Sequence, residues 1–414
     1  MRTTRWPARP STSPWRWSPS TPDALPGQAM ITPDYQGGGI TNLMASVAQG
    51  LGGRPSGYPP APLVDPAALA GAANVLLLVI DGLGYDYLQR HGAGGFLQSN
   101  CQGRLTSVCP STTASAIPTF LFGVPPQQHG FTGWFGYYRE LGSVLAVLPF
   151  RPRHGGAPLG TQEISPRALC GREPLSESLA VPSLAVMPEW IADSDFNRAF
   201  QGPARLARYR DMETFFDCCA AGLRGGGRHY VYAYWPEFDA LAHEFGVASP
   251  QVAEHLARLE AGLERLQRRI AGSDTLVLVT ADHGMIDSPP ERTILLGQHP
   301  VLADSLVLPL CGEPRFAYAY LRSGREQAFR EYITGELAHA IDLHPSGRLL
   351  EQGWFGSGPP HPRLHQRIGD YALVLRDNYK IKDFILGEHP HLHIGVHGGV
   401  SQAEMYVPLI RWES

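Results

Sequence analysis

Long apolar runs are missing from this chain of 414 residues. No stretch approaches the ~20 apolar residues of a membrane-spanning helix, and the N-terminus carries arginines without the apolar core of a secretory signal. An excess of one charge is missing too, because 34 lysines and arginines stand against 38 aspartates and glutamates, a net charge of -4. We therefore expect a cytoplasmic protein with no membrane anchor and no nucleic-acid-binding surface.

Cysteine is scarce and irregularly placed. The six cysteines contain no Cys-x-x-Cys pair, and they lie at Cys101, Cys109, Cys170, Cys218, Cys219 and Cys311. This pattern is typical of isolated thiols and not of a disulfide framework or a cysteine metal site.

The first 29 residues lack any hydrophobic periodicity. They are rich in Pro, Ser, Thr, Arg and Trp, so residues 1–29 are expected to be a disordered N-terminal extension. Residues 30–414 are long enough to bury a large core, and we expect them to form one domain.

Two apolar runs each lead into an aspartate. Residues 74–80 read Asn-Val-Leu-Leu-Leu-Val-Ile before Asp81, and residues 275–280 read Thr-Leu-Val-Leu-Val-Thr shortly before Asp282. Such runs predict strands that are buried on both faces. Ligands of open α/β sheets bind just beyond the carboxyl ends of the strands. Both aspartates are thus expected where chemistry usually occurs, and their oxygens suit a divalent metal ion.

The middle of the chain predicts a parallel sheet. A third apolar run covers residues 229–234, and a helix follows it. Ser249 is a favourable N-cap and Pro250 a favourable first helical residue, and apolar residues then recur at three- and four-residue spacing. Strand, helix and strand with short connections form a βαβ unit. We therefore predict an α/β fold with a doubly wound, mostly parallel sheet flanked by helices.

Two segments depart from this pattern. Residues from about 135 to 180 are rich in Gly, Pro and Arg, and they predict long lid loops over the core. Residues from about 304 to 386 predict a small α+β insertion, with strands at 305–310, 316–321 and 371–375 and a helix around 329–337.

Further candidate metal ligands follow the predicted strands. Asp239 and His243 are four residues apart, which places both side chains on one face of a helical turn. His283 follows Asp282 directly, and His397 precedes two glycines, with His393 as its alternative. Together with Asp81, these residues make three aspartates and three histidines. That mixed set of oxygen and nitrogen donors suits two zinc-like ions.

A nucleophile can be placed near these ligands. Residues 110–113 read Pro-Ser-Thr-Thr and precede a predicted helix over 114–122. A hydroxyl there can be a simple N-cap. Beside a metal ion it can also ionise and attack, while the amides of the helix N-terminus favour a bound oxyanion.

These motifs, in this order, resemble the alkaline phosphatase superfamily and, more narrowly, the type I phosphodiesterase/nucleotide pyrophosphatase family. The resemblance covers residues from about 75 to 409 and implies an alkaline phosphatase-like fold and a small phosphate-ester substrate. It also implies Thr113 as the catalytic nucleophile, with Ser111, Thr112 and Ser115 as substitutes. Two Zn²⁺ per chain would follow, one held by Asp81, Thr113, Asp282 and His283 and the other by Asp239, His243 and His397.

The chain also departs from the family pattern. A family asparagine that binds a phosphate oxygen corresponds to Trp134, and Ala-Ser-Ala follows Thr113 where Phe-Pro-Asn is usual. Phosphonoacetate hydrolase-like or phosphomonoesterase activity on the same site therefore stays open, as does a non-catalytic binding protein. A sulfatase is disfavoured because no arginine follows Cys109 in register. A phosphoglycerate mutase is disfavoured because its inserted transferase domain has no room. The sequence does not indicate an oligomeric state.

Overall fold

A seven-stranded sheet forms the centre of the computed structural model, which describes residues 30–224, 227–388 and 390–414. The predicted N-terminal extension lies outside these residues. The strand order is β2-β18-β9-β1-β8-β6-β7. The central strand β1 (Asn74–Ile80) pairs in parallel with β8 (His229–Trp235) on one side and with β9 (Thr275–Thr280) on the other. The three apolar runs are therefore neighbouring parallel strands.

The outer strands complete the sheet. β6 (Ser183–Pro188) and β7 (Arg205–Tyr209) continue it in parallel beyond β8. On the other side, β18 (Tyr406–Glu413) runs antiparallel to β9 and to the edge strand β2 (Cys101–Thr106). The predicted mostly parallel α/β fold is confirmed.

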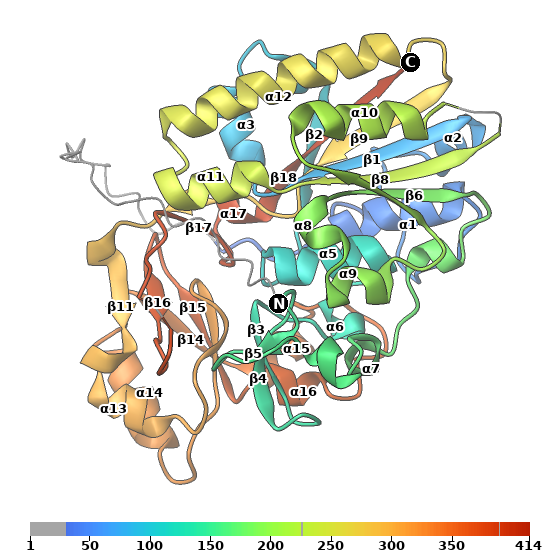
Figure 1. Ribbon diagram of the computed structural model, residues 1–414. Helices are drawn as coiled ribbons and strands as arrows, with labels where there is room; N and C mark the ends of the chain where they lie inside the picture. Colours follow the sequence, from blue (N-terminus) through green and yellow to red (C-terminus); the bar gives the residue numbers. More distant parts are fainter. Residues whose placement is uncertain (1–29, 225–226, 389) are drawn as a thin grey trace.

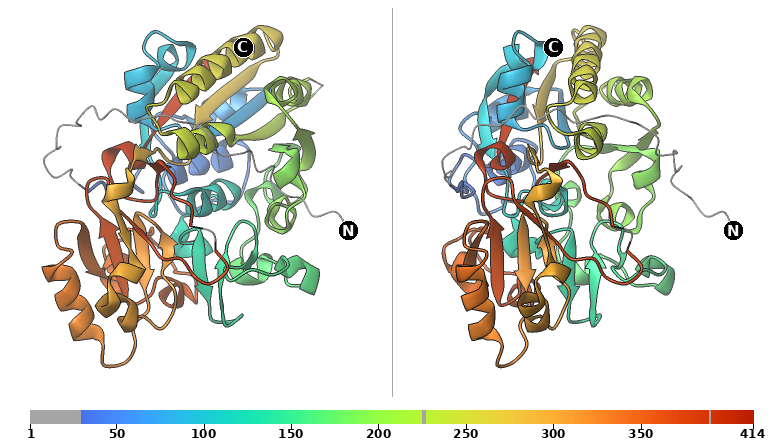
Figure 2. Two further views of the ribbon diagram at one scale, coloured as in Figure 1. Left: turned by 60° about the vertical axis from the view of Figure 1, so that its left-hand side comes forward. Right: turned by 90° about the vertical axis from the view of Figure 1, so that its left-hand side faces the viewer.

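Helices cover both faces of this sheet (Figures 1 and 2). One face carries α10 (Met212–Gly222) and α12 (Pro250–Arg269), and the other carries α1 (Ile40–Gly50) and α5 (Thr113–Phe122). Every residue of β1 and β9 is consequently buried, which explains why their sequences show no polar alternation. None of the helices in the described ranges is long and apolar enough to cross a membrane.

The helix after β8 begins as its sequence predicts. The Ser249 side chain accepts a hydrogen bond from the Val252 amide, and Pro250 is the first helical residue. Between β8 and this helix lies α11 (Glu237–Phe245). The shorter helices are α2 (Pro66–Gly71), α3 (Tyr85–His91), α4 (Phe96–Ser99), α6 (Pro126–His129), α7 (Arg167–Cys170), α8 (Glu189–Ala192), α9 (Asp195–Phe200), α13 (Pro300–Ser305), α14 (Glu326–Gly335), α15 (Ser346–Glu351), α16 (Leu364–Arg367) and α17 (Gln402–Met405).

A second seven-stranded sheet, in which neighbouring strands pair antiparallel, lies beside the first (Figure 1). Its strands, in spatial order, are β14 (Ile341–Pro345), β15 (Tyr371–Leu375), β13 (Phe316–Ala319), β12 (Cys311–Glu313), β3 (Phe135–Tyr138), β4 (Ser143–Ala146) and β5 (Arg151–Pro152). The two segments that the sequence separated, around 135–180 and 304–386, thus contribute to one sheet.

Two details of the sequence prediction are wrong. Residues 135–152 are not lid loops but contain the strands β3, β4 and β5, because Gly142 and Pro149 lie in turns between short strands. Residues 305–310 do not form a strand, since α13 extends to Ser305 and only an isolated bridge follows at Leu306. A short apolar segment of this kind cannot be assigned from its sequence alone.

Two short pairings bring distant loops together. β10 (Ile286–Asp287) pairs with β17 (Gly395–Val396), and β11 (Thr293–Leu295) pairs with β16 (Lys380–Lys382). A Cβ atom on Gly395 would lie 2.3 Å from the Ala242 carbonyl oxygen, so β17 approaches α11 backbone to backbone. The residues just after β17 are therefore held beside α11.

A substitution at Gly262 tests the packing of α12 on α10. Alanine is the better helix former by about 1 kcal/mol, but a Cβ atom there would lie 2.0 Å from Cε2 of the buried Phe216 ring. Gly262→Ala should therefore lower the free energy of unfolding by about 1–2 kcal/mol, because overpacking outweighs helix propensity. Urea denaturation of the wild type and the variant measures this difference in the free energy of unfolding. Gly335→Ala in α14, where the Cβ would meet nothing within 4 Å, is the control and should not destabilise the protein.

Candidate active site

Two buried aspartates follow the central strands. Asp81 comes directly after β1, and Asp282 lies one residue beyond β9. The Tyr234 hydroxyl donates a hydrogen bond to Asp81 Oδ2, and the Gly82 and His283 amides donate to Asp282 Oδ1 over 3.1 and 3.0 Å. These hydrogen bonds fix both carboxyl groups at the carboxyl edge of the sheet.

The electrostatics of this edge favour a cation. Burial, and then the carboxylates of Asp282 and Asp239, raise the pKa of Asp81 well above its usual range. Burial likewise raises the pKa of Asp282. The like charges repel one another in a medium of low dielectric, so a positive ion would stabilise the ionised form of all three.

The helix α11 supplies Asp239 and His243 on one face. His243 Nδ1 donates to the Gly395 carbonyl oxygen over 2.7 Å, which leaves Nε2 facing Asp239 Oδ2 at 3.3 Å. His397, just after β17, places its Nε2 3.9 Å from Asp239 Oδ1. A backbone hydrogen bond that fixes the imidazole tautomer is typical of histidines that bind metal ions.

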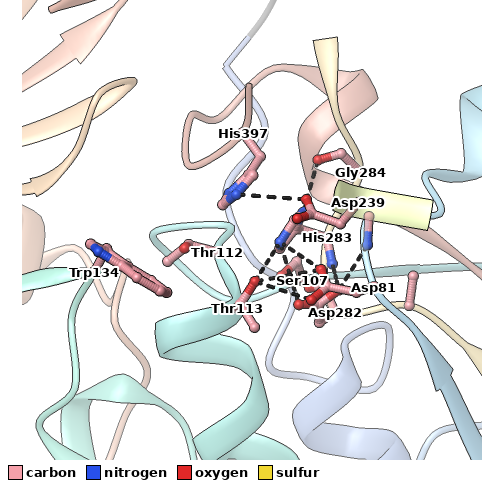
Figure 3. A network of polar contacts seen from close by, with 12 residues as sticks. Asp81, Ser107, Thr112, Thr113, Trp134, Asp239, Asp282, His283, Gly284 and His397 are labelled. Carbon is pink, nitrogen blue, oxygen red and sulfur yellow. Dashed lines mark hydrogen bonds and ion pairs between the residues drawn. The ribbon is translucent and has the colours of Figure 1, made fainter. Parts of the chain in front are cut away.

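His283 lies at the centre of the cluster. Its Nδ1 donates to the Gly284 carbonyl oxygen, and its ring stacks on that of His397 with 3.8 Å between centroids. Nε2 lies 3.3 Å from Asp81 Oδ1 and 3.3 Å from Asp282 Oδ2. Figure 3 shows His283 between Asp81 and Asp282 on one side and Asp239 and His397 on the other.

The hydroxyl of Thr113 points into this cluster. Thr113 is the first residue of α5, and its Oγ1 lies 3.1 Å from His283 Nε2 and 3.4 Å from both carboxylate oxygens of Asp81. Two neighbouring hydroxyls are engaged elsewhere, because Ser111 donates to the Gly399 carbonyl oxygen and Thr112 donates to Glu313. Of these three hydroxyls, only that of Thr113 contacts the aspartates and histidines.

Five of the six donors form two overlapping groups of three whose ligand atoms lie within 4.8 Å of one another: Asp81, Asp282 and His283 form one, and Asp239, His283 and His397 the other, while His243 lies in neither. Asp239 Oδ1 and Asp282 Oδ2 are buried without a hydrogen-bond partner in the described part of the chain. Bound cations would satisfy both oxygens, so the residues fit metal ions. His393 contacts the His243 ring, with 4.5 Å between centroids, but belongs to neither group.

A close backbone contact explains the glycine after His283. A Cβ atom on Gly284 would lie 2.0 Å from the Ala403 carbonyl oxygen and 2.8 Å from the Gly84 Cα. The loop after β9 therefore packs directly on the loop after β1, and this contact brings Asp282 and His283 next to Asp81.

The sequence did not indicate Glu313, at the end of β12. Its side chain is 6% exposed, and one oxygen accepts hydrogen bonds from Thr112 Oγ1 over 2.7 Å and from the Trp134 amide over 2.6 Å. Burial raises the pKa of Glu313 to about 7, although both hydrogen bonds oppose the shift. A single acidic residue between short apolar strands carries no motif, so only the fold could reveal it.

The structure of murine ectonucleotide pyrophosphatase/phosphodiesterase 5 is similar, with 18% identity over 81% of this chain and 87% of that chain and a TM-score of 0.61. Its inactive variant in complex with AMP matches at 17% identity over the same shares, with a TM-score of 0.60. Phosphonoacetate hydrolase from Sinorhizobium meliloti 1021 in complex with phosphonoformate matches at 16% identity over 82% and 90%, with a TM-score of 0.59. At such identities these likenesses establish the fold. No curated protein sequence matches the chain.

The sequence provides the family assignment. Residues 75–399 match the family model described as type I phosphodiesterase / nucleotide pyrophosphatase, and this range includes every residue of the cluster, from Asp81 to His397. The chain belongs to the type I phosphodiesterase/nucleotide pyrophosphatase family of the alkaline phosphatase superfamily, and this family consists of metal-dependent hydrolases that act on phosphoester bonds.

Proposed function

We propose that the protein is a two-zinc phosphodiesterase, similar to nucleotide pyrophosphatases, in which Thr113 is the nucleophile. The observation that carries this proposal is the position of Thr113 Oγ1, within 3.4 Å of both carboxylate oxygens of Asp81 and 3.1 Å from His283 Nε2. A hydroxyl at a helix N-terminus that contacts a buried aspartate and a buried histidine, beside the other acidic and imidazole groups of the cluster, is suited to attack phosphorus.

Zinc fits the donors of this cluster. The set mixes carboxylate oxygens with imidazole nitrogens, and two of the buried oxygens lack a hydrogen-bond partner in the described residues. Asp81, Thr113, Asp282 and His283 would hold one ion, and Asp239, His243 and His397 the other. When bound, two divalent cations supply the positive charge that activates hydroxyl and water nucleophiles and stabilises a leaving oxygen.

The residues of the chain can then divide the reaction into two displacements. In the first, Thr113 Oγ1 forms a bond to phosphorus and its proton passes to the Asp81 carboxylate, which lies beside it, while the bond from phosphorus to one ester oxygen breaks and that oxygen takes a proton from solvent to leave as an alcohol. In the second, water displaces the threonine and releases a phosphate monoester. The amides at the N-terminus of α5 face the same space and favour the charged phosphoryl oxygens.

A second candidate is cleavage of a phosphonate on the same site. The fold is as similar to phosphonoacetate hydrolase as to the nucleotide pyrophosphatase, with TM-scores of 0.59 and 0.61. Moreover, Trp134 stands where an asparagine would contact phosphate, and its amide is bound to Glu313. A small phosphate ester remains the favoured substrate because the family model is that of the phosphodiesterases.

Removing the nucleophile should stop turnover without displacing the metal. Thr113→Ala is expected to lower kcat by about 10³-fold or more, because it removes the hydroxyl that contacts Asp81 and His283. Steady-state kinetics and metal analysis measure the two effects. Thr113→Ser, which keeps a hydroxyl, is the matched control and should retain measurable activity. A Thr113→Ala enzyme with the wild-type rate would transfer the nucleophile role to Ser111, Thr112 or Ser115.

Metal content should follow the donor set. We expect the purified protein to carry about two zinc equivalents, and chelation to abolish activity until zinc is restored. Asp282→Asn should lower the bound zinc, since it removes the charge of a buried ligand. Elemental analysis checks both. Full activity after exhaustive chelation would contradict the mechanism.

A substrate panel should decide the reaction class. We expect a phosphodiester to be hydrolysed faster than a phosphomonoester, a phosphonate or a sulfate ester by one metal-loaded preparation, because the family assignment favours diesters. Initial rates at equal substrate concentration provide the comparison. The highest rate on the phosphonate would favour the second candidate instead.

A further inference from the structure

The N-cap residue of α5 does not cap its helix. Thr112 has the extended backbone of an N-cap, with φ -145° and ψ 150°, but its side chain makes no capping hydrogen bond. An N-cap threonine ordinarily accepts a hydrogen bond from the amide of the second or third helical residue. Here the hydroxyl donates to Glu313 Oε1 instead, over 2.7 Å. A local stability rule is therefore broken beside the nucleophile, which is where functional constraints are expected to override such rules.

Glu313 is held so that it cannot follow Thr112. It belongs to β12 of the second sheet, and the same oxygen accepts the Trp134 amide over 2.6 Å. A Cβ atom on Gly398 would lie 2.6 Å from the Glu313 Cβ, so the side chain also packs against the loop that follows His397. Because three segments fix this carboxylate, its position decides the orientation of the Thr112 hydroxyl.

The orientation of the Thr112 hydroxyl affects the first backbone amides of α5. The Ser115 and Ala116 amides donate to the Thr112 carbonyl oxygen over 3.0 and 2.9 Å. Within the described residues, the amides of Thr113 and Ala114 donate to no protein acceptor. These amides begin a helix of 10 residues, and they belong to the residue that carries the proposed nucleophile and to the next. A phosphoryl oxygen at Thr113 would need them.

We propose that Glu313 is a positioning residue: it holds the Thr112 hydroxyl away from the N-terminus of α5 and so keeps the Ala114 amide, next to that of Thr113, open to a phosphoryl oxygen. This inference rests on the proposed function. Without the Glu313 carboxylate, the Thr112 hydroxyl is free to turn and accept a hydrogen bond from the start of its own helix. The Thr112 hydroxyl would then compete with a phosphoryl oxygen of the substrate for the amide at the start of α5.

The test is a double-mutant cycle between Glu313 and Thr112, because the two residues act on the same amides. Glu313→Ala should lower kcat/KM by about tenfold or more, a smaller loss than the roughly 10²–10³-fold of a deleted oxyanion donor, because the amide is competed for and not removed. Thr112→Val, which cannot cap the helix, should lose less activity. The double variant should recover to within about threefold of Thr112→Val, since no hydroxyl remains to occupy the amides.

Two further variants serve as controls. Glu313→Gln keeps an oxygen that can accept both hydrogen bonds, and it should stay within about threefold of the wild-type rate. Glu313→Met fills the same space without accepting a hydrogen bond, and it should behave as Glu313→Ala does. It also replaces that variant if the alanine protein does not fold.

Inhibition by inorganic phosphate provides a second measurement. If Glu313 only stabilised the fold, its replacement would not change the inhibition constant for phosphate. The inhibition constant for phosphate should rise in Glu313→Ala and fall again in the double variant, while zinc content stays constant. A double variant as slow as Glu313→Ala, or slower, would overturn the inference. So would unchanged kinetics and unchanged phosphate inhibition in Glu313→Ala or Glu313→Met.

Thr113→Ala, assayed alongside, separates the two proposals. If Thr113→Ala keeps the wild-type rate, the proposed function is wrong, and the proposal that Glu313 is a positioning residue is wrong as well. If it is inactive while Glu313→Ala and Glu313→Met match the wild type, only the inference about Glu313 fails.

Discussion

Mutual repulsion among three carboxylates is the constraint on which this site depends. Asp81 and Asp282 are buried at neighbouring strand ends, and Asp239 lies close enough for its charge to raise the pKa of both. Such a cluster is costly in a protein interior unless positive charge compensates it. The unpartnered oxygens of Asp239 and Asp282 indicate where that charge would lie. Binding of metal ions and stability of the folded site should therefore be coupled.

Close backbone packing gives the cluster its geometry. Gly284 brings the loop after β9 against the loop after β1, and Gly395 brings β17 against α11. At both positions a side chain would collide with a backbone carbonyl oxygen. His283 and His397 can stack at 3.8 Å between ring centroids because their loops are held this closely. The ligands are thus positioned by main-chain contacts, which tolerate little displacement.

The second sheet does more than cover the first. Through Glu313 it contacts Thr112, the residue before Thr113, and the amide of Trp134, and it packs on Gly398 beside His397. The second sheet is therefore attached to the candidate site through this side chain. In physical terms, differences in specificity can arise here without any change in the metal ligands.

Local patterns in the sequence determined the buried parallel strands, the helix that begins at Pro250, and the identity of the candidate ligands, because each depends on residues close together in the chain. Only the tertiary structure decided how those parts combine. It joined segments around 135–152 and 311–375 into one sheet, which short strands of low periodicity do not reveal. It also distinguished Thr113 from its neighbouring hydroxyls and placed Glu313 beside them, since both depend on hydrogen bonds between residues 170 or more positions apart.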